Sequence, residues 1–413
     1  MTRSNRRDFL QQSLGAMAAV ALTPSLAELS PLAGRSVDIS VALVGAGRQG
    51  RAILAELQKI EGVTIAAICD TDPGRLKKAG RRVQGCRSYA THQELLEKES
   101  DVQAVIVATP THLHRGPALD ALAAGKHVYC EAPLASTIED SKALAAAARK
   151  SDRVFACSLL ARSNPIYKLA RSFFRSGSLR DLVSLRAQDF AKTSWRSSAP
   201  DANREKLLNW RLDKSVSLGL PGELGTHQFD AYHWFLGKYP TSVRGSGSVR
   251  VHKDGRDVAD TALCDLSFAD GLRLSWQATL GNSYDGRYEV YSGSMASFKL
   301  AWTAGWMFKE ADAPTQGWEV YANRQTFHND QGITLIADAT KLAAQGKLEA
   351  GVGLPNPPVH YAIADFLTSC SEATDPAAGA EEGHRAAVVG ICASQALRSG
   401  LEVAIEPELF DLR

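Results

Sequence analysis

The most chemically informative residues lie near the start of the globular part of the chain. An apolar, β-branched run at 39–44 leads directly into Gly45–Gly50, which reads G-A-G-R-Q-G, and a helical pattern follows. In such a strand–loop–helix unit, Gly45 permits a tight turn, Gly47 lets the backbone approach a pyrophosphate, and Gly50 lets the helix pack close to the strand. The helix N-terminus adds unpaired N–H groups that attract phosphate. The pattern predicts a dinucleotide site; a surface turn before an unrelated helix is the alternative.

A carboxylate follows the next predicted strand. The run at 63–69 ends at Asp70, 25 residues beyond Gly45. An acid at this place accepts hydrogen bonds from the ribose hydroxyls of adenosine and repels a 2′-phosphate, which favours NAD over NADP. Arg75 lies nearby and leaves room for NADP, because a guanidinium can bind the additional phosphate.

Strand and helix patterns alternate from residue 37 to about 160. Strands are predicted at 39–44, 63–69, 103–108, 126–130 and 153–157, and helices at 48–60, 72–80, 91–98, 112–124 and 136–150. Repeated units with apolar strands predict a doubly wound parallel sheet of the α/β class. Ligands bind at the carboxyl ends of such strands, so the loops at 108–110 and 131–133 are expected to face the cofactor.

After a predicted helix at 165–175 the pattern changes to alternating strands separated by turn signals such as Asp270-Gly271. These strands are expected at 178–190, 242–251, 259–268, 272–280, 287–292 and 297–300, and helices at 225–236, 357–370 and 381–398. The pattern predicts a second, α+β domain with an open antiparallel sheet. We therefore assign 35–160 to an NAD(P)-binding Rossmann domain and 161–413 to substrate binding and oligomerisation. The broad sheet face predicts a homodimer or homotetramer.

The first residues resemble an export signal rather than part of the fold. Arg3, Arg6 and Arg7 precede a short, mildly apolar stretch at 14–22, and a small-residue cleavage pattern ends at Ala27. Paired arginines of this kind are typical of the twin-arginine route, which carries folded proteins to the periplasm. We expect residues 1–34 to be signal and linker; a basic disordered tail on a cytoplasmic protein is the alternative.

Composition excludes several classes of partner. Cleavage after Ala27 removes three of the 47 basic and one of the 45 acidic residues, which leaves 44 of each. A chain of zero formal charge does not attract nucleic acid or an anionic membrane. No apolar run reaches the length of a membrane span. The seven cysteines are scattered without a C-x-x-C pair, so neither a disulfide framework nor a metal site is expected.

Further motifs connect these elements to a known family. They are Ala108–His114 (ATPTHLH), Ala124–Leu134 (AGKHVYCEAPL), Arg162-x-x-Pro165, Trp210–Asp213 (WRLD) and Glu223–Asp230 (ELGTHQFD). Together with the glycine motif they resemble the glucose–fructose oxidoreductase/inositol dehydrogenase/rhizopine-catabolism (Gfo/Idh/MocA) superfamily over about residues 37–405. The resemblance implies a nucleotide domain followed by an open antiparallel sheet. It also implies hydride exchange between NAD(P) and a sugar or cyclitol.

The resemblance assigns catalytic positions as well. The family's usual lysine lies in a Glu-Lys-Pro motif, where this chain has Ala132, and the family's Asp and His four residues apart correspond to Glu223 and His227. We expect His227 to accept the hydroxyl proton, with Glu223 or Asp230 orienting its ring. Arg162 is the candidate for the positive charge that the lysine would otherwise supply. The residues expected to bind the cofactor are Gly45, Gly47, Arg48, Gln49, Gly50, Asp70, Arg75, Thr109, Pro110, His114, Glu131, Ala132, Pro133, Trp210 and Arg211.

Three functions stay open on these residues. The first is an exported NAD(P)-dependent oxidoreductase that acts on a sugar or cyclitol hydroxyl or ketone and holds its cofactor tightly, since no free cofactor pool is expected in the periplasm. The second is an NAD-dependent glycosidase or lyase, in which transient oxidation of one sugar carbon permits β-elimination. The third is a cofactor-binding protein without turnover, which the alanine at position 132 motivates.

Overall fold

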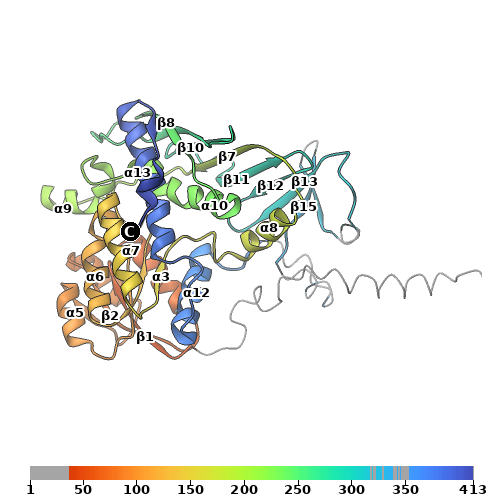
Figure 1. The fold of residues 1–413 in the computed structure, drawn as a ribbon. Coiled ribbons are helices and arrows are strands. Elements are labelled where there is room, and N and C mark those ends of the chain that lie inside the picture. Colours follow the sequence, from red (N-terminus) through yellow and green to blue (C-terminus); the bar gives the residue numbers. More distant parts are fainter. Residues whose placement is uncertain are drawn as a thin grey trace, which may run out of the picture.

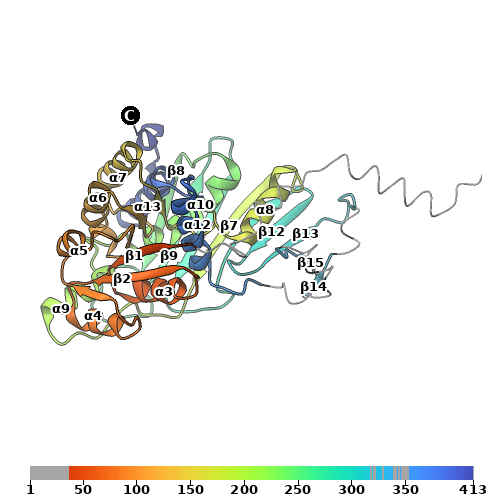
Figure 2. The same ribbon diagram turned by 90° about the horizontal axis from the view of Figure 1, so that it is seen from below.

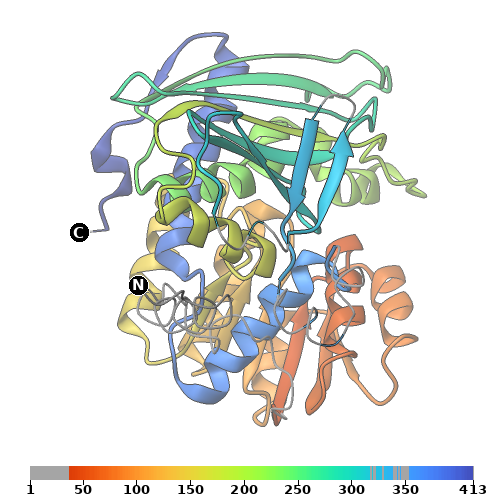
Figure 3. The same ribbon diagram turned by 90° about the vertical axis from the view of Figure 1, so that its right-hand side faces the viewer.

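A computed structural model describes residues 37–316, 319, 322–327, 330–337, 342, 345 and 353–412. The expected export signal at 1–34 lies outside these described residues. The described part of the chain builds two sheets, which Figure 3 shows one above the other, with the nucleotide-type half below.

The first sheet is parallel, with the strand order β3-β2-β1-β4-β5-β6. Its strands are β1 (Ile39–Val44), β2 (Val63–Cys69), β3 (Arg87–Tyr89), β4 (Ala104–Val107), β5 (His127–Cys130) and β6 (Phe155–Cys157). The strand β4 is buried at every position, because helices cover both faces of the sheet. The predicted doubly wound sheet is confirmed. The short strand β3 was not predicted, since three residues leave no readable period.

The helices of this half are α3 (Arg48–Leu57), α4 (Pro73–Gly80), α5 (His92–Lys98), α6 (Arg115–Ala123) and α7 (Ile138–Lys150). Three of them begin at a side-chain cap, in which Asp72, Thr91 or Thr137 accepts a backbone N–H from the first turn. The predicted helix at 112–124 is wrong at its start: Thr111–Leu113 forms a 3₁₀ turn and α6 begins at Arg115. Pro117 then lies in the first turn, where a missing N–H costs no hydrogen bond.

The second sheet has the order β14-β15-β13-β12-β11-β7-β10-β9-β8-β16. Its strands are β7 (Leu182–Phe190), β8 (Ser242–Ser248), β9 (Thr261–Ser267), β10 (Arg273–Thr279), β11 (Arg287–Gly293), β12 (Ala296–Leu300), β13 (Gly305–Lys309), β14 (Arg324–Phe327), β15 (Asp330–Thr334) and β16 (Val403–Ala404). Neighbouring strands run antiparallel, except that β7 and β10 are parallel. The open, mostly antiparallel sheet is therefore confirmed. The parallel pair arises because β7 enters the middle of the sheet, between β10 and β11.

The remaining helices are α8 (Pro165–Arg175), α9 (Ala202–Leu208), α10 (Thr226–Leu236), α12 (Pro358–Glu372) and α13 (Ala380–Ser399). Figure 1 shows α10 and α13 on one face of the second sheet, where they cover its buried side chains. The helix α9 was not predicted. It joins the two halves of the molecule, because Arg204 donates two hydrogen bonds to the buried carboxylate of Asp72 in front of α4.

The two last helices also reach the first sheet. Figures 1 and 2 show α13 beside α7, where the Ser141 hydroxyl and the His384 ring are 2.8 Å apart. The helix α12 packs on the other face, with the rings of Phe366 and Tyr129 at 5.6 Å. The C-terminal residues thus complete the hydrophobic core beneath the nucleotide-type strands.

The described residues contain neither a candidate membrane span nor a candidate metal site. None of the helices there is long and apolar enough to cross a membrane. No group of His, Cys, Asp and Glu side chains within the same residues could hold a metal ion. All seven cysteines, which are among these residues, carry free thiols.

Candidate active site

The glycine loop after β1 has the geometry of a phosphate cradle. Gly45 has φ +103°, and a Cβ there would lie 2.5 Å from the Ala108 carbonyl. A Cβ on Gly50 would lie 1.9 Å from the Gly45 carbonyl oxygen, so only glycine lets α3 pack this close. The side of Gly47 is open instead, with Arg75 Nη1 at 3.8 Å as the nearest neighbour. The backbone at Gly47 is therefore approachable by a ligand.

Asp70 stands at the carboxyl end of β2, beside this loop. Its two oxygens accept the N–H groups of Ala46 at 2.7 Å and of Asp72 at 2.8 Å. The carboxylate is thus fixed in place and only partly buried, with lone pairs left for a ribose hydroxyl. Arg75 is also partly buried, and Arg48 is exposed in the first turn of α3.

The loops after β4 and β5 are tied to each other by His114. Its ring nitrogens contact the carbonyl oxygens of Thr109 at 2.9 Å and Pro133 at 3.0 Å, and burial lowers its pKa to about 4. The neutral ring therefore shapes this loop. The hydroxyl of Thr109 is buried without a partner among the described residues, which leaves one hydrogen-bonding group for a ligand.

Glu131 closes the same edge from β5. The Gln49 side-chain amide donates to it at 3.2 Å, so the start of α3 is joined to the end of β5. Burial raises the pKa of Glu131 to about 7, against the hydrogen bonds from Gln49 and Ser158 and the charge of Arg211. The next residue, Ala132, offers no polar group. Most of the residues predicted to bind the cofactor thus lie around the carboxyl ends of four adjacent strands.

Glu223 lies over the loop that follows β4. It belongs to a π-helical turn, Pro221–Gly225, that precedes α10, a geometry common at functional sites. Its carboxylate accepts the Thr111 hydroxyl at 3.0 Å and the Leu218 N–H at 3.3 Å. Burial raises its pKa, opposed by the charge of Arg211. Arg211 Nε lies 3.6 Å from the carboxylate.

Trp210 and Arg211 form a cover beside this acid. The Trp210 ring lies 5.6 Å from the His112 ring, on the loop after β4. The Arg211 guanidinium stands over two indoles, 4.9 Å from Trp210 and 5.5 Å from Trp195. This segment therefore brings flat apolar surface and one cation to the edge of the predicted cofactor site. The Nδ1 atom of His112 is buried without a partner in the described residues.

His227 lies in the first turn of α10. Neither ring nitrogen has a hydrogen-bond partner among the described residues, and Nδ1 is buried. Nε2 is therefore the nitrogen left to meet a ligand. Burial, reinforced by the charge of Arg287, lowers the pKa of His227 to about 3. The imidazole is therefore neutral at physiological pH and a weaker base than an ordinary histidine.

Two expectations about this histidine are wrong. Asp230 does not orient the His227 ring, because it is held by Arg162 through hydrogen bonds of 2.8–3.2 Å. Glu223 does not bond the ring either, since its oxygens face Thr111 and the Leu218 amide. Arg162 itself is 8% exposed and satisfied by Asp230, so it is not the cation beside the imidazole.

The cation beside His227 is Arg287, which sequence reasoning missed. Its guanidinium lies 3.7 Å from the centre of the Trp302 ring, and the His227 ring meets the same indole edge-on at 6.3 Å. Behind the indole, Glu289 accepts its N–H at 3.1 Å. In the sequence, neither Trp302 nor Arg287 belongs to a motif, and only a turn signal precedes Arg287.

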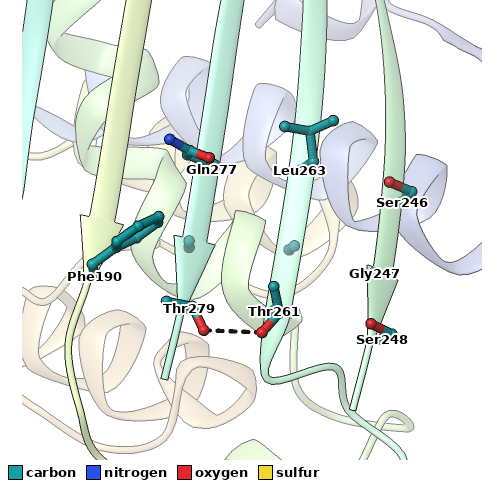
Figure 4. Close-up of a pocket in the computed structure, with 10 residues that line it drawn as sticks. Phe190, Ser246, Gly247, Ser248, Thr261, Leu263, Gln277 and Thr279 are labelled. Carbon is teal, nitrogen blue, oxygen red and sulfur yellow. Dashed lines mark hydrogen bonds between the residues drawn. The ribbon is translucent and has the colours of Figure 1, made fainter. Parts of the chain in front are cut away.

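A separate shallow hollow lies on the open face of the second sheet. Figure 4 shows its side chains on the face turned away from the helices, among them Phe190, Leu263 and Gln277. The Thr261 and Thr279 hydroxyls join β9 to β10 there at 2.9 Å. None of the predicted site residues lines this hollow. Leu263, 47% exposed, marks it as apolar sheet surface.

Comparison with known proteins agrees with the fold. Residues 39–158 match a GFO/IDH/MocA model described as an oxidoreductase family with an NAD-binding Rossmann fold. Residues 167–299 match the C-terminal domain of the same family. The two models together span more than half of the chain, and the chain belongs to the GFO/IDH/MocA family.

Individual relatives share between 22% and 33% sequence identity with this chain. A levoglucosan dehydrogenase from Pseudarthrobacter phenanthrenivorans is 28% identical over 51% of this chain and 58% of its own length. A glycosyl hydrolase family 109 protein from Shewanella amazonensis is 33% identical over 34% of this chain and 36% of its own length. A solved levoglucosan dehydrogenase, in complex with NADH and levoglucosan, has a TM-score of 0.69 at 22% identity, covering 89% of this chain and 99% of that one. This last likeness concerns the fold.

Proposed function

We propose that this protein is an NAD-dependent oxidoreductase that exchanges a hydride with a hydroxyl or ketone of a sugar or cyclitol. The observation that carries the proposal is His227, a neutral imidazole with no partner in the described residues, four residues after Glu223, whose carboxylate accepts the Thr111 hydroxyl of the loop after β4. An unpartnered ring at that place can take the proton of an alcohol.

The residues present fit a dinucleotide. Gly47 leaves its side open to a pyrophosphate, and Asp70 keeps acceptor capacity for ribose hydroxyls, which supports NAD over NADP. The unpartnered Thr109 hydroxyl lies in the loop after β4, and the Trp210 indole packs beside His112 of the same loop. When bound, NAD accepts the hydride that leaves the carbinol carbon.

The remaining chemistry belongs to the protein. His227 Nε2 accepts the hydroxyl proton when the alcohol is oxidised and returns it when the ketone is reduced. The positive charge of Arg287 lies beside the ring and favours the oxyanion that develops on the substrate. Ala132 leaves space where relatives of this family carry a lysine, so the proton has no lysine route.

A glycosidase or lyase is the second candidate. Two observations favour it: the similarity to a glycosyl hydrolase family 109 protein over 34% of this chain, and the alanine at position 132. Here the same oxidation would acidify a neighbouring C–H, and elimination of the glycosidic substituent would follow before the hydride returns. Aryl glycosides in deuterated water distinguish the two candidates. Release of the aryl group with deuterium beside the oxidised carbon supports elimination, and an oxidised sugar alone supports the dehydrogenase.

Export and assembly belong to the same proposal. The paired arginines at 6–7 support a twin-arginine signal and a periplasmic enzyme, for which NAD held through turnover is the consistent arrangement. The exposed side chain of Leu263 on the open sheet face supports a homodimer or homotetramer formed through that face.

The test starts with the mature protein, purified and denatured, and its released nucleotide identified. We expect NAD, and NAD reduction with sugars or cyclitols as substrates. His227→Asn should lower kcat/KM by about 10²–10⁴-fold. His233→Asn is the matched control, because His233 lies on the same helix but stacks on Tyr239, and it should leave kcat/KM unchanged. If no pyridine nucleotide binds, or if His227→Asn retains full activity, the proposal fails, and a nucleotide without turnover indicates a cofactor-binding protein.

A further inference from the structure

Arg287 is held as if to present its guanidinium to a ligand. It opens β11 and is paired in register with Asp189 of β7. Its face lies flat on the Trp302 indole, with 3.7 Å between the guanidinium carbon and the ring centre. The indole N–H in turn donates to buried Glu289, which fixes the ring. The plane of the guanidinium is therefore determined by its surroundings rather than by solvent.

The hydrogen bonds of this guanidinium are not completed by the protein. Nε and Nη2 are buried and have no hydrogen-bond partner in the described part of the chain. Asp189 approaches Nε at 3.2 Å, but not in hydrogen-bond geometry. Buried donors of a charged group are normally satisfied, because leaving them unpaired is costly. An acceptor from outside the chain is the missing element.

The position of Arg287 says where that acceptor must come from. Its charge acts on the His227 ring, and both side chains contact Trp302. A single sugar could therefore reach both the Arg287 guanidinium and the Nε2 atom of His227. Resting on the proposed function, we infer that Arg287 binds a carboxylate of the substrate, so that this site takes a sugar acid, such as an aldonate or uronate, rather than a neutral sugar.

A carboxylate suits this site better than a phosphate. It matches the planar fork of one arginine with two parallel N–H···O bonds. The charge available is small, since the Asp189 carboxylate lies 3.2 Å from Arg287 Nε, and the Arg211 charge lies beside the Glu223 carboxylate at 3.6 Å. A monoanion is what one partly neutralised guanidinium can balance, whereas a dianion would stay uncompensated.

Binding of a substrate carboxylate at Arg287 would also raise the proton affinity of His227. The positive charge of Arg287 disfavours protonation of His227. A carboxylate on the guanidinium offsets that charge, so the ring becomes a stronger proton acceptor when the acid is in place. The groups that face His227 are thus Arg287 and, across the indole, Glu289, whose carboxylate is turned to the Tyr167, Gln228 and Trp302 donors.

The test compares matched pairs of ligands on the NAD-loaded protein. Calorimetric titration with D-glucuronate against D-glucose, and with D-gluconate against D-glucitol, should give at least about 10²-fold tighter binding of one or both acids, as expected of a charge-assisted pair of hydrogen bonds. Arg287→Gln should remove this preference and leave the binding of neutral sugars within about threefold. Arg287→Lys keeps the charge without the fork and should restore only part of it.

The matched control is Arg273→Gln, which removes an exposed arginine paired with Asp265 in the neighbouring strand and should keep the preference. Unfolding curves of each variant establish that it is folded, and the wild-type comparison stands even if a variant is not. Equal affinity for acids and neutral sugars, or an acid preference that survives in Arg287→Gln, overturns the inference. Because binding is the readout, an Arg287-dependent acid site without NAD reduction would leave the inference standing and refute the proposed reaction.

Discussion

Two arginine–aspartate pairs, one buried and one partly buried, lie in the second half of the molecule, and they differ in how completely their hydrogen bonds are formed. Arg162 gives three hydrogen bonds of 2.8–3.2 Å to Asp230, and both side chains are shielded from solvent. Arg287 meets Asp189 at 3.2 Å, with two nitrogens that have no hydrogen-bond partner in the described residues.

The difference separates structure from function. A fully bonded pair leaves nothing for a ligand and serves to hold α10 against the segment before α8. A pair with unused donors leaves room for an acceptor from a ligand, and it lies beside His227, an imidazole whose Nδ1 is also without a partner in the described residues. The sequence offers both arginines on equal terms, and we expected Arg162 at the site. Hydrogen-bond accounting in three dimensions reverses that choice.

The largest expected effect is a loss of stability when the fully hydrogen-bonded pair of Arg162 and Asp230 is broken. Arg162→Met leaves the buried Asp230 carboxylate without its partner and should lower the free energy of unfolding by about 3–5 kcal/mol. Arg287→Met removes no hydrogen bond to Asp189 and should cost about 1 kcal/mol, since Asp189, whose pKa burial raises, can take up a proton. Urea unfolding of both variants measures the two values. Equal losses would show that the pairs do not differ.

A smaller effect concerns pH. Burial lowers the pKa of His227 to about 3, whereas an unfolded histidine titrates near 6.5. Between these values the unfolded chain binds a proton that the folded chain does not, so stability falls as the pH drops from about 6.5 toward 3. His227→Asn should retain about 2–3 kcal/mol of stability that the wild type loses between pH 7 and pH 4.5. Parallel pH profiles for the two proteins would contradict a buried neutral ring.

The smallest expected effect concerns the pair of Arg287 and Asp189, whose hydrogen bonds are incomplete, and the Trp302 ring beneath Arg287. Trp302→Leu removes the flat surface on which Arg287 rests, and a cation–π contact of this kind contributes about 0.5–2 kcal/mol. The preference for a sugar acid should weaken by about threefold to tenfold, with binding of neutral sugars changed less. Titration with the glucuronate and glucose pair measures it. An unchanged preference would mean that Asp189 alone positions the guanidinium.

The fold was accessible from the sequence because its signal is local. The strand patterns at 39–44 and 63–69 coincide with β1 and β2, and the helix at 165–175 coincides with α8. The short elements β3, β16 and α9 were missed, since little periodicity can be read over so short a run. The turn before α10 was also missed, because a π-helical turn has no sequence pattern of its own.

The candidate site was accessible only where motifs carried it. Glycine spacing predicts the loop of Gly45–Gly50, and its geometry follows from steric limits on that backbone. The partners of His227 depend instead on the register of β7 against β11, which brings Arg287 beside Asp189, and on where β12 ends, which places Trp302. Those contacts join residues far apart in the chain, and nothing in their local sequence indicates them.

The last two helices have a consequence for how the chain is made. Phe366 of α12 and Ala387 of α13 belong to the hydrophobic layers on the two faces of the first sheet, some two hundred residues after its last strand is synthesised. Until the ribosome has released those helices, the nascent strands keep apolar surface exposed to solvent. The first sheet therefore completes its hydrophobic core only after α12 and α13 have been synthesised.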